Sequence, residues 1–118
     1  MTSVLDRAKA HYGAAELREI DVPEWGDESG PLVLGYRRAT LRELADASQA
    51  ADGNMVMTNA YIVAMKALGK DGKRLFNTAD ARELARTADP TVITRIAAAM
   101  APGAGAVTAE TLDDAEKN

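Results

Sequence analysis

The chain contains no cysteine and only one histidine, His11, among its 118 residues. Without cysteine it forms no disulfide bond and offers no thiolate to a metal ion. A lone histidine on an N-terminal helix lacks the orienting partner and the pocket that a general base needs. The sequence also lacks a nucleophile–base pair, a metal-ligand spacing and a phosphate-binding loop. We therefore expect no enzyme activity, no catalytic or metal-binding residues and no cofactor.

Positive charge is not in excess, because 14 lysines and arginines accompany 18 acidic residues, for a net charge of −4. Such a chain has no general attraction to nucleic-acid phosphates or anionic lipids, so we expect no nucleic-acid and no membrane partner. The most apolar run, residues 55–68, is shorter than the roughly 20 residues of a membrane-spanning helix. The charged segment 1–12 has no apolar centre and does not look like a secretory signal. These features predict a soluble intracellular protein.

Aromatic residues make up only 4% of the chain. They are Tyr12, Trp25, Tyr36, Tyr61 and Phe76. The core must therefore consist mainly of leucine, isoleucine, valine and methionine, which favours closely packed helices. A chain of this length is expected to form one domain with one modest core.

The N-terminal third has the pattern of two strands. Residues 17–22 alternate between apolar and charged side chains, as in a half-buried strand. Pro23 cannot donate a ladder hydrogen bond, so it is predicted to end this strand, and two prolines, two glycines and three acids predict a loop over residues 23–31. Residues 32–37 alternate again. The two strands predict an antiparallel hairpin over about residues 16–38, whose apolar face must lie on helices.

Helical periodicity with capping residues marks five further segments, namely residues 3–11, 40–50, 54–68, 78–86 and 89–100. Predicted N-caps are Ser3, Thr40, Thr78 and Asp89, and predicted C-terminal ends are Gly13 and Gly69. Thr40 and Glu43 fit a capping box, and Pro90 suits a first helical position. The predicted inward faces are Leu41, Leu44, Ala45 and Ser48 in the second segment, and Val92, Ile93, Ile96, Ala97 and Met100 in the last.

These patterns predict an α+β fold that is mostly α, with an N-terminal β-hairpin packed on a small bundle of about four helices. Residues 1–101 are expected to form a single globular domain, with the hairpin at about 16–38 and the bundle at about 40–101. The helix at residues 3–11 is equally consistent with a docked and a frayed terminal helix. Residues 102–118 are small, polar and acidic, and they predict a flexible C-terminal tail.

Three segments suggest ligand binding without the full pattern for it. Glu24, Asp27 and Glu28 crowd one loop but lack the oxygen spacing of a calcium loop. Residues 70–74 are basic, yet a phosphate loop needs more glycines and a Lys–Ser/Thr pair after a strand. The last two helices could form a helix-turn-helix, but the second one offers only Arg95 and two threonines to DNA. A solvated loop, a turn and a structural helix pair are the simpler interpretations.

Apolar side chains that contact a protein partner are the remaining candidates. The lone tryptophan, Trp25, either packs on the helices as a core anchor or contacts a partner. Met57, Phe76 and Met100 are the other candidate partner contacts. At these helical spacings core packing is the more common role of methionine, so both interpretations stay open.

The chain also carries an ordered set of short motifs. Val-Pro-Glu-Trp-Gly at residues 22–26 is followed by Tyr-Arg-Arg at 36–38, Thr-Leu-Arg-Glu at 40–43, Asp-Gly-Lys-Arg-Leu-Phe at 71–76 and Asp-Pro-Thr-Val-Ile-Thr-Arg-Ile at 89–96. In this order, over about residues 17–100, they resemble the tail assembly chaperones of long-tailed phages, prophages and gene-transfer particles. Similar Pro-Glu-Trp-Gly, Asp-Gly-Lys-Arg-Leu-Phe and Pro-X-Val-Ile-X-Arg-Ile segments recur in that family.

The resemblance implies a non-enzymatic protein that binds the long, helical, aggregation-prone tape measure protein and keeps it soluble. It also implies recruitment of tail tube protein, a place in the bacterial host cytoplasm and absence from the mature particle. Many members exist in a second form, lengthened by a ribosomal frameshift, and the residues after Pro102 would suit a linker to such an extension. Self-association is a further partner hypothesis. A structural tail-completion or head–tail joining protein and a small DNA-binding regulator remain the alternative functions.

Overall fold

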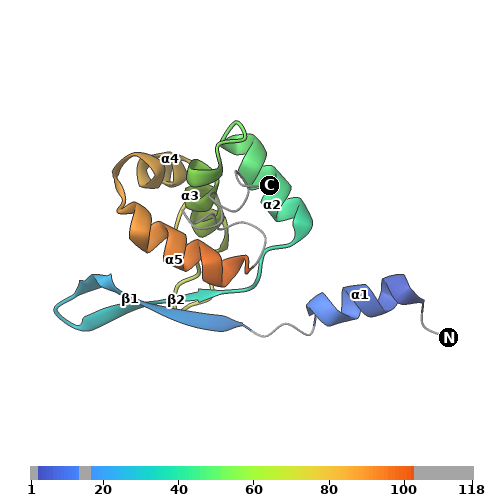
Figure 1. Cartoon of the computed structure of the whole chain (residues 1–118). Coiled ribbons are helices and arrows are strands. Elements are labelled where there is room, and N and C mark those ends of the chain that lie inside the picture. The colour runs from blue at the N-terminus through green and yellow to red at the C-terminus, as the bar shows by residue number, and fades with distance from the viewer. Residues whose placement is uncertain (1–2, 14–16, 103–118) are drawn as a thin grey trace, which may run out of the picture.

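The computed structural model describes residues 3–13 and 17–102. Its elements are α1 (Val4–Gly13), β1 (Arg18–Asp27), β2 (Gly30–Tyr36), α2 (Leu41–Ala50), α3 (Met55–Lys66), α4 (Thr78–Thr87) and α5 (Pro90–Met100). Figure 1 shows the hairpin along one side of the four helices α2–α5, with α5 next to β1. The predicted α+β fold, a hairpin packed on a four-helix bundle, is confirmed. The predicted tail lies outside the described residues from residue 103 onward.

The inner face of the hairpin carries its apolar side chains. Val22 and Leu34 are fully buried and Tyr36 is nearly so, whereas Glu19 and Asp21 on the opposite face are exposed. The inner residues join one core cluster with Ile62, Val63, Ile96 and Met100 from the helices. The period-two pattern of the strands therefore identifies the face that the helices cover, as predicted.

The predicted loop over residues 23–31 is wrong, because β1 continues to Asp27 and the turn is confined to two residues. Pairing is regular from Arg18 opposite Tyr36 to Val22 opposite Leu32, and it then shifts register before Asp27 pairs with Gly30. Pro23 thus follows the last regular pair of the ladder without ending the extended chain.

Two glycines allow the end of the hairpin to close. A side chain at Gly26 would overlap the carbonyl oxygen of Gly30 and lie 2.8 Å from the Cα atom of Pro31. Gly30 has a φ of +127°, a conformation that residues with side chains rarely adopt. Asp27 accepts hydrogen bonds from the backbone N–H and the hydroxyl of Ser29, at 2.9 and 2.6 Å, and this closes the turn.

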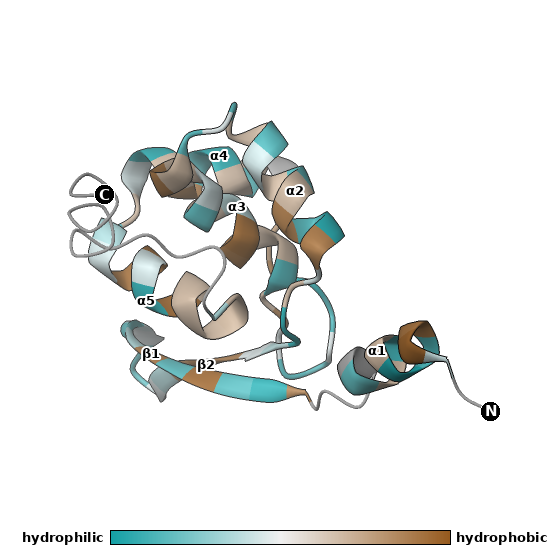
Figure 2. Cartoon of the chain, turned by 45° about the vertical axis from the view of Figure 1, so that its right-hand side comes forward, coloured by the Kyte–Doolittle hydropathy of each residue, from teal (hydrophilic) through white to brown (hydrophobic). Residues whose placement is uncertain are grey.

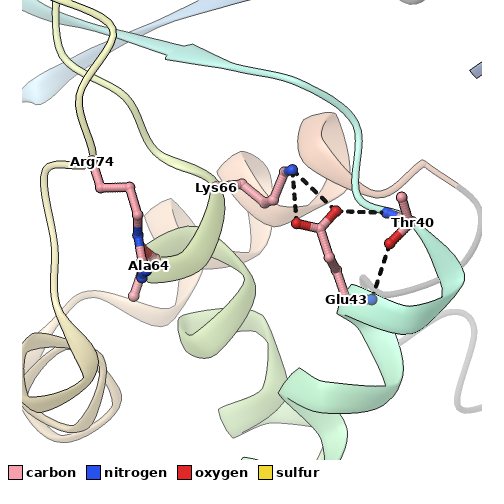
Figure 3. A network of polar contacts seen from close by, with 5 residues as sticks. All are labelled: Thr40, Glu43, Ala64, Lys66 and Arg74. Atoms are coloured by element: carbon pink, nitrogen blue, oxygen red, sulfur yellow. Dashed lines mark hydrogen bonds and ion pairs between the residues drawn. The ribbon is translucent and has the colours of Figure 1, made fainter. Parts of the chain in front are cut away.

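The predicted capping box at the start of α2 is confirmed and is linked to α3. Thr40 Oγ1 accepts from the N–H of Glu43 at 3.1 Å, and the Thr40 N–H donates to Glu43 Oε1 at 2.9 Å. Lys66 Nζ lies 3.0 Å from both Glu43 carboxylate oxygens (Figure 3). Burial alone raises the pKa of Glu43, but the Thr40 N–H and the Lys66 ammonium outweigh it and hold the pKa below its usual 4.5. This network fixes α2 against α3.

The C-terminal end of α3 differs from the prediction. The helix ends at Lys66 with Ala67 as its C-cap, so Gly69 is not the helix end and Leu68 lies outside the helix. Leu68 is extended and exchanges two backbone hydrogen bonds with Gly35 of β2, at 2.9 and 2.7 Å. Strand-like pairing with the hairpin therefore replaces the last helical turn predicted for α3, and helical periodicity does not reveal this pairing.

The other helix predictions hold with two corrections. Asn77, not Thr78, is the N-cap of α4, and it forms a capping box with Asp80. Asp89 caps α5 and Pro90 is at its start, as predicted, and all five residues of the predicted inward stripe of α5 are buried. The predicted inward face of α2 is correct only in part. Leu44 packs against the core and Ser48 is half-buried, whereas Leu41 is 84% exposed, Ala45 is exposed and the buried residue is Ala47.

Helix α1 stands apart from the body of the protein (Figure 1). Its side chains from Val4 to His11 are all exposed, including Val4 at 72% and Leu5 at 64%. Figure 2 shows apolar colour on this helix, whose ribbon stands clear of the other elements. A docked α1 is therefore not observed, and Ser3 caps it locally through the N–H of Asp6 at 3.0 Å.

Candidate functional site

The acidic residues of the hairpin do not converge on one point. Glu24 pairs with Arg95 of α5 through two contacts of 2.7 Å, while Asp27 is engaged with Ser29, whose hydroxyl and N–H lower the pKa of Asp27. Across the described parts of the chain, no three acidic, histidine or cysteine side chains gather as metal ligands. These acids stabilise the hairpin and its attachment to α5.

The two other segments considered for ligand binding have structural roles. Residues 70–74 form a turn in which Gly72 has a φ of +78° and Asp71 accepts from the N–H of Lys73 at 3.0 Å. The Arg74 guanidinium donates to the carbonyl of Ala64 at 3.4 Å (Figure 3). In α5, the pairing of Arg95 with Glu24 removes the one arginine that a DNA-reading helix would present there.

The pair between Glu24 and Arg95 makes the free energy of unfolding vary with pH in the acidic range. Hydrogen bonding to the Arg95 guanidinium lowers the pKa of Glu24 from 4.5 to about 2. Because the folded pKa lies below the unfolded one, the pair contributes its full stability above pH 4.5, and this contribution is lost as the pH falls toward about 2. We expect the melting temperature of Glu24→Gln to fall less steeply with acidification than that of the wild type.

Thermal unfolding followed by circular dichroism across this range measures the difference. Asp46→Asn is the control, because Asp46 pairs with Arg42 at 3.3 Å on the surface of α2 and both side chains are largely exposed. The control is expected to follow the wild-type slope. A Glu24→Gln slope equal to that of the wild type would show that the pair contributes nothing.

The most distinctive surface feature is a group of exposed apolar residues at the start of α3. Met55, Val56 and Met57 occupy consecutive positions of the helix and are exposed by 54%, 59% and 39%. An unbranched methionine adapts to contacts of varied shape, so two of these three residues suit a variable partner surface. Contiguous exposed apolar residues commonly mark a protein-interaction site.

Hollows open on both sides of Met57. The larger, of about 630 Å³, lies between the turn after α2, α3 and α4, and its lining includes Asn54, Met57, Tyr61, Arg82 and Arg86. The smaller, of about 90 Å³, lies between α3, α4 and α5, and its lining includes Val56, Met57, Ala60, Leu84 and Ile93. Since both are lined by Met57, we call the combined surface the Met57 groove.

The Met57 groove combines apolar walls with two arginines and one acid, Asp52. Its walls include half-buried Tyr61 and Leu84, while Arg82 and Arg86 follow each other by one helical turn along α4 and are both exposed. Arg86 lies 3.4 Å from Glu83 in a surface pair, which is a weak restraint on the arginine. The groove therefore suits an apolar ridge flanked by acidic side chains.

A third hollow, of about 310 Å³, lies on the other side of α4 and includes Phe76 and Leu84 in its lining. Phe76 packs edge-to-face against Trp25, with ring centroids 6.3 Å apart and an interplanar angle of 77°. Leu84 also lines the smaller hollow of the Met57 groove. Leu84 thus borders hollows on both sides of α4, and acidic Asp80 and Glu83 also line the third one.

The four predicted partner contacts have different environments. Met57 is exposed and central to the groove, and Phe76 and Trp25 are half-buried against each other. Met100 has no exposed surface, so it packs in the core and is withdrawn as a partner contact. Sequence reasoning missed Arg82 and Arg86, although their spacing of four residues puts them on one face of α4.

None of the described helices combines the length and the apolar content needed to cross a bilayer. The fold is that of an α+β protein in which a hairpin covers one side of a helical bundle and a groove opens beside α4. No protein-family model matches this chain, and searches of curated proteins and of solved structures find no match.

Proposed function

We propose that this protein is a non-enzymatic tail assembly chaperone that binds the tape measure protein and tail tube subunits while a phage-type tail is assembled. The observation that carries the proposal is the exposed Met57 groove, which offers adaptable apolar contacts beside two arginines. The ordered motifs over residues 17–100 support the same assignment by resemblance. Under this proposal the protein acts in the host cytoplasm and leaves before the particle matures.

A helical client fits the shape and the chemistry of the groove. An amphipathic helix binds by placing apolar side chains at positions i, i+3, i+4 and i+7 into a hydrophobic groove. Met55 and Met57 would contact such side chains without demanding one fixed shape. Arg82 and Arg86 would pair with acidic residues beside the apolar stripe. A chaperone with this surface holds many successive client segments weakly and keeps them from aggregating.

Co-expression with the tape measure protein of the same particle tests the proposal. The expected result is that the tape measure protein becomes soluble and co-purifies with this chain. An insoluble client that does not bind would contradict the proposal. Recovery of this chain from purified mature particles by mass spectrometry would instead identify a structural tail component.

The substitution Met57→Asp is expected to weaken client binding by at least about tenfold, because it replaces an apolar contact at the centre of the groove with a hydrated carboxylate that competes with the client for Arg82 and Arg86. The fold is expected to survive, since the side chain at this position is 39% exposed. Binding is measured by titrating labelled client fragments into the protein, and circular dichroism checks the fold. Leu41→Asp is the matched control, because Leu41 is exposed on α2 and does not line the groove. Equal loss in both variants would contradict a groove-specific role.

A further inference from the structure

The two edges of the hairpin are used differently. On the β2 side, Gly35 N–H donates to the Leu68 carbonyl at 2.9 Å and Leu68 N–H donates to the Gly35 carbonyl at 2.7 Å. On the β1 side, the described residues supply no third strand, because the sheet has the order β1–β2. One edge is therefore closed by the chain itself, and the other is open along β1.

The pairing register shows which backbone groups face the open edge. Because both backbone groups of Gly35 point toward Leu68, the opposite residue, Glu19, forms a non-hydrogen-bonded pair with it and its own groups point away from β2. The alternation puts Asp21 in the same orientation. Pro23 is next in this alternation, so its missing N–H also faces outward, where it costs no ladder bond. The open edge thus offers the N–H and C=O groups of Glu19 and Asp21.

The side chains at this edge are acidic. Glu19 and Asp21 are exposed on the outer face of the sheet, and neither forms an ion pair among the described residues. Beside them an open hollow of about 290 Å³ includes Leu17, Glu19, Val33 and Gly35 in its lining. Gly35 has no side chain to fill it, and Lys70 lies on the β2 side of the hollow, beyond Gly35. The outer face therefore combines an apolar hollow with negative charge at its free edge.

A second copy of this chain is a poor occupant of the edge. In the antiparallel registers that pair the outward groups of Glu19 and Asp21 with those of a second copy, an acid of one copy lies opposite an acid of the other. Like charges directly opposite each other destabilise a strand pair. The acids thus protect the edge from self-pairing, as charged residues do on other edge strands.

We propose that the open edge of β1 binds an extended segment of another protein by strand addition, and that this segment carries lysine or arginine at every second residue. Its backbone completes the ladder at Glu19 and Asp21, and its cationic side chains lie opposite the two acids on the outer face. This surface lies on the hairpin rather than in the Met57 groove, so the inference does not depend on the function proposed above.

Designed peptides test the edge directly. The probe is a capped octapeptide of alternating lysine and valine, added to the ¹⁵N-labelled full chain and followed by NMR and fluorescence anisotropy. In an antiparallel pairing, residues opposite Glu19 and Asp21 share the outer face with them, so the lysine N–H groups of the bound peptide point toward β1. N-methylation of the lysine amides is expected to abolish binding, whereas N-methylation of the valine amides is expected to preserve it. Amide shifts are expected at Glu19 and Asp21.

Charge reversal gives an independent test. Glu19→Lys/Asp21→Lys is expected to weaken the lysine–valine peptide by about tenfold or more and to favour a glutamate–valine peptide instead. Glu28→Lys/Asp46→Lys makes the same change in net charge elsewhere and is expected to bind like the wild type. The inference is overturned if both N-methylated peptides bind equally, if the shifts map to the Met57 groove, or if the peptide does not bind.

Discussion

Replacing Leu34 with alanine is expected to lower the free energy of unfolding by about 3 kcal/mol, within the roughly 2–5 kcal/mol seen for buried leucines. Leu34 is fully buried in the cluster that joins the hairpin to the helices. Its neighbour Gly35 is held by Leu68 on one side, and β1 pairs with β2 on the other. Since these restraints keep β2 from moving into the space, the cavity stays open and its cost is added to the lost apolar contacts.

Urea unfolding followed by two signals measures this effect. Trp25 fluorescence reports the hairpin, and far-ultraviolet circular dichroism reports the helices. Coincident transitions would show that hairpin and bundle unfold together. Leu41→Ala is the control, and it is expected to change stability by less than about 0.5 kcal/mol, because Leu41 is 84% exposed. A Leu34→Ala variant as stable as this control would contradict a core role for the hairpin.

Local sequence rules predict those parts of the fold in which the interacting residues are close together in the sequence. The capping box of Thr40 and Glu43 and the cap at Asp89 depend on residues three or fewer positions away, and both are present as predicted. The alternation of Leu34 and Tyr36 fixes the buried face of β2, because a strand has only two faces. These predictions succeed because the determining partners are close in the sequence.

The errors arise where a distant partner decides. Leu68 fits the apolar periodicity of α3, but its backbone pairs with Gly35 more than thirty residues earlier in the chain. Leu41 fits an inward stripe in α2, yet Leu44 and Ala47 are the residues that face the core. Helix α2 has apolar residues on more than one side, and only the position of α3 selects among them. No pattern within a helix contains that information.

In the candidate site, too, nearby sequence identifies the type of residue, whereas distant elements determine its exposure. The type of residue, an unbranched methionine near a helix start, identifies Met57 as a possible contact, but its exposure depends on how α2 and α4 flank α3. Met100 has the same side chain and is fully buried, because α5 lies between the hairpin and α3. Methionine identity alone therefore does not separate a contact from a core residue.

The motif at residues 22–26 illustrates how most residues of a sequence signature can have structural roles. Val22 is buried, Pro23 lies where a missing N–H is tolerated, Glu24 binds Arg95, and Gly26 permits the close approach of Gly30. Four of its five residues thus shape the hairpin or attach it to α5. The fifth, Trp25, is the one whose role a substitution can decide.

Trp25→Ala is expected to lower the free energy of unfolding by about 2 kcal/mol. The ring is half-buried, packs against the core cluster and meets Phe76 edge-to-face at 6.3 Å. Partial exposure makes the loss smaller than the 3–5 kcal/mol typical of a fully buried ring. Circular dichroism is the signal, because the variant has no tryptophan left. Phe76→Leu, alone and combined with Trp25→Ala, is expected to show a coupling of about 0.5–1.5 kcal/mol between the two rings.

Client binding by the same variants separates the two roles of the ring. If Trp25 is a core anchor, the folded fraction of Trp25→Ala still binds the tape measure protein, because the Met57 groove is formed by α3, α4 and the turn before α3. A variant that keeps wild-type stability within about 0.5 kcal/mol but loses client binding would contradict this expectation. Such a result would indicate that the client contacts the hairpin and not the Met57 groove. Comparison with Met57→Asp under the same conditions then shows which surface holds the client, since only one of the two substitutions should weaken binding without unfolding the chain.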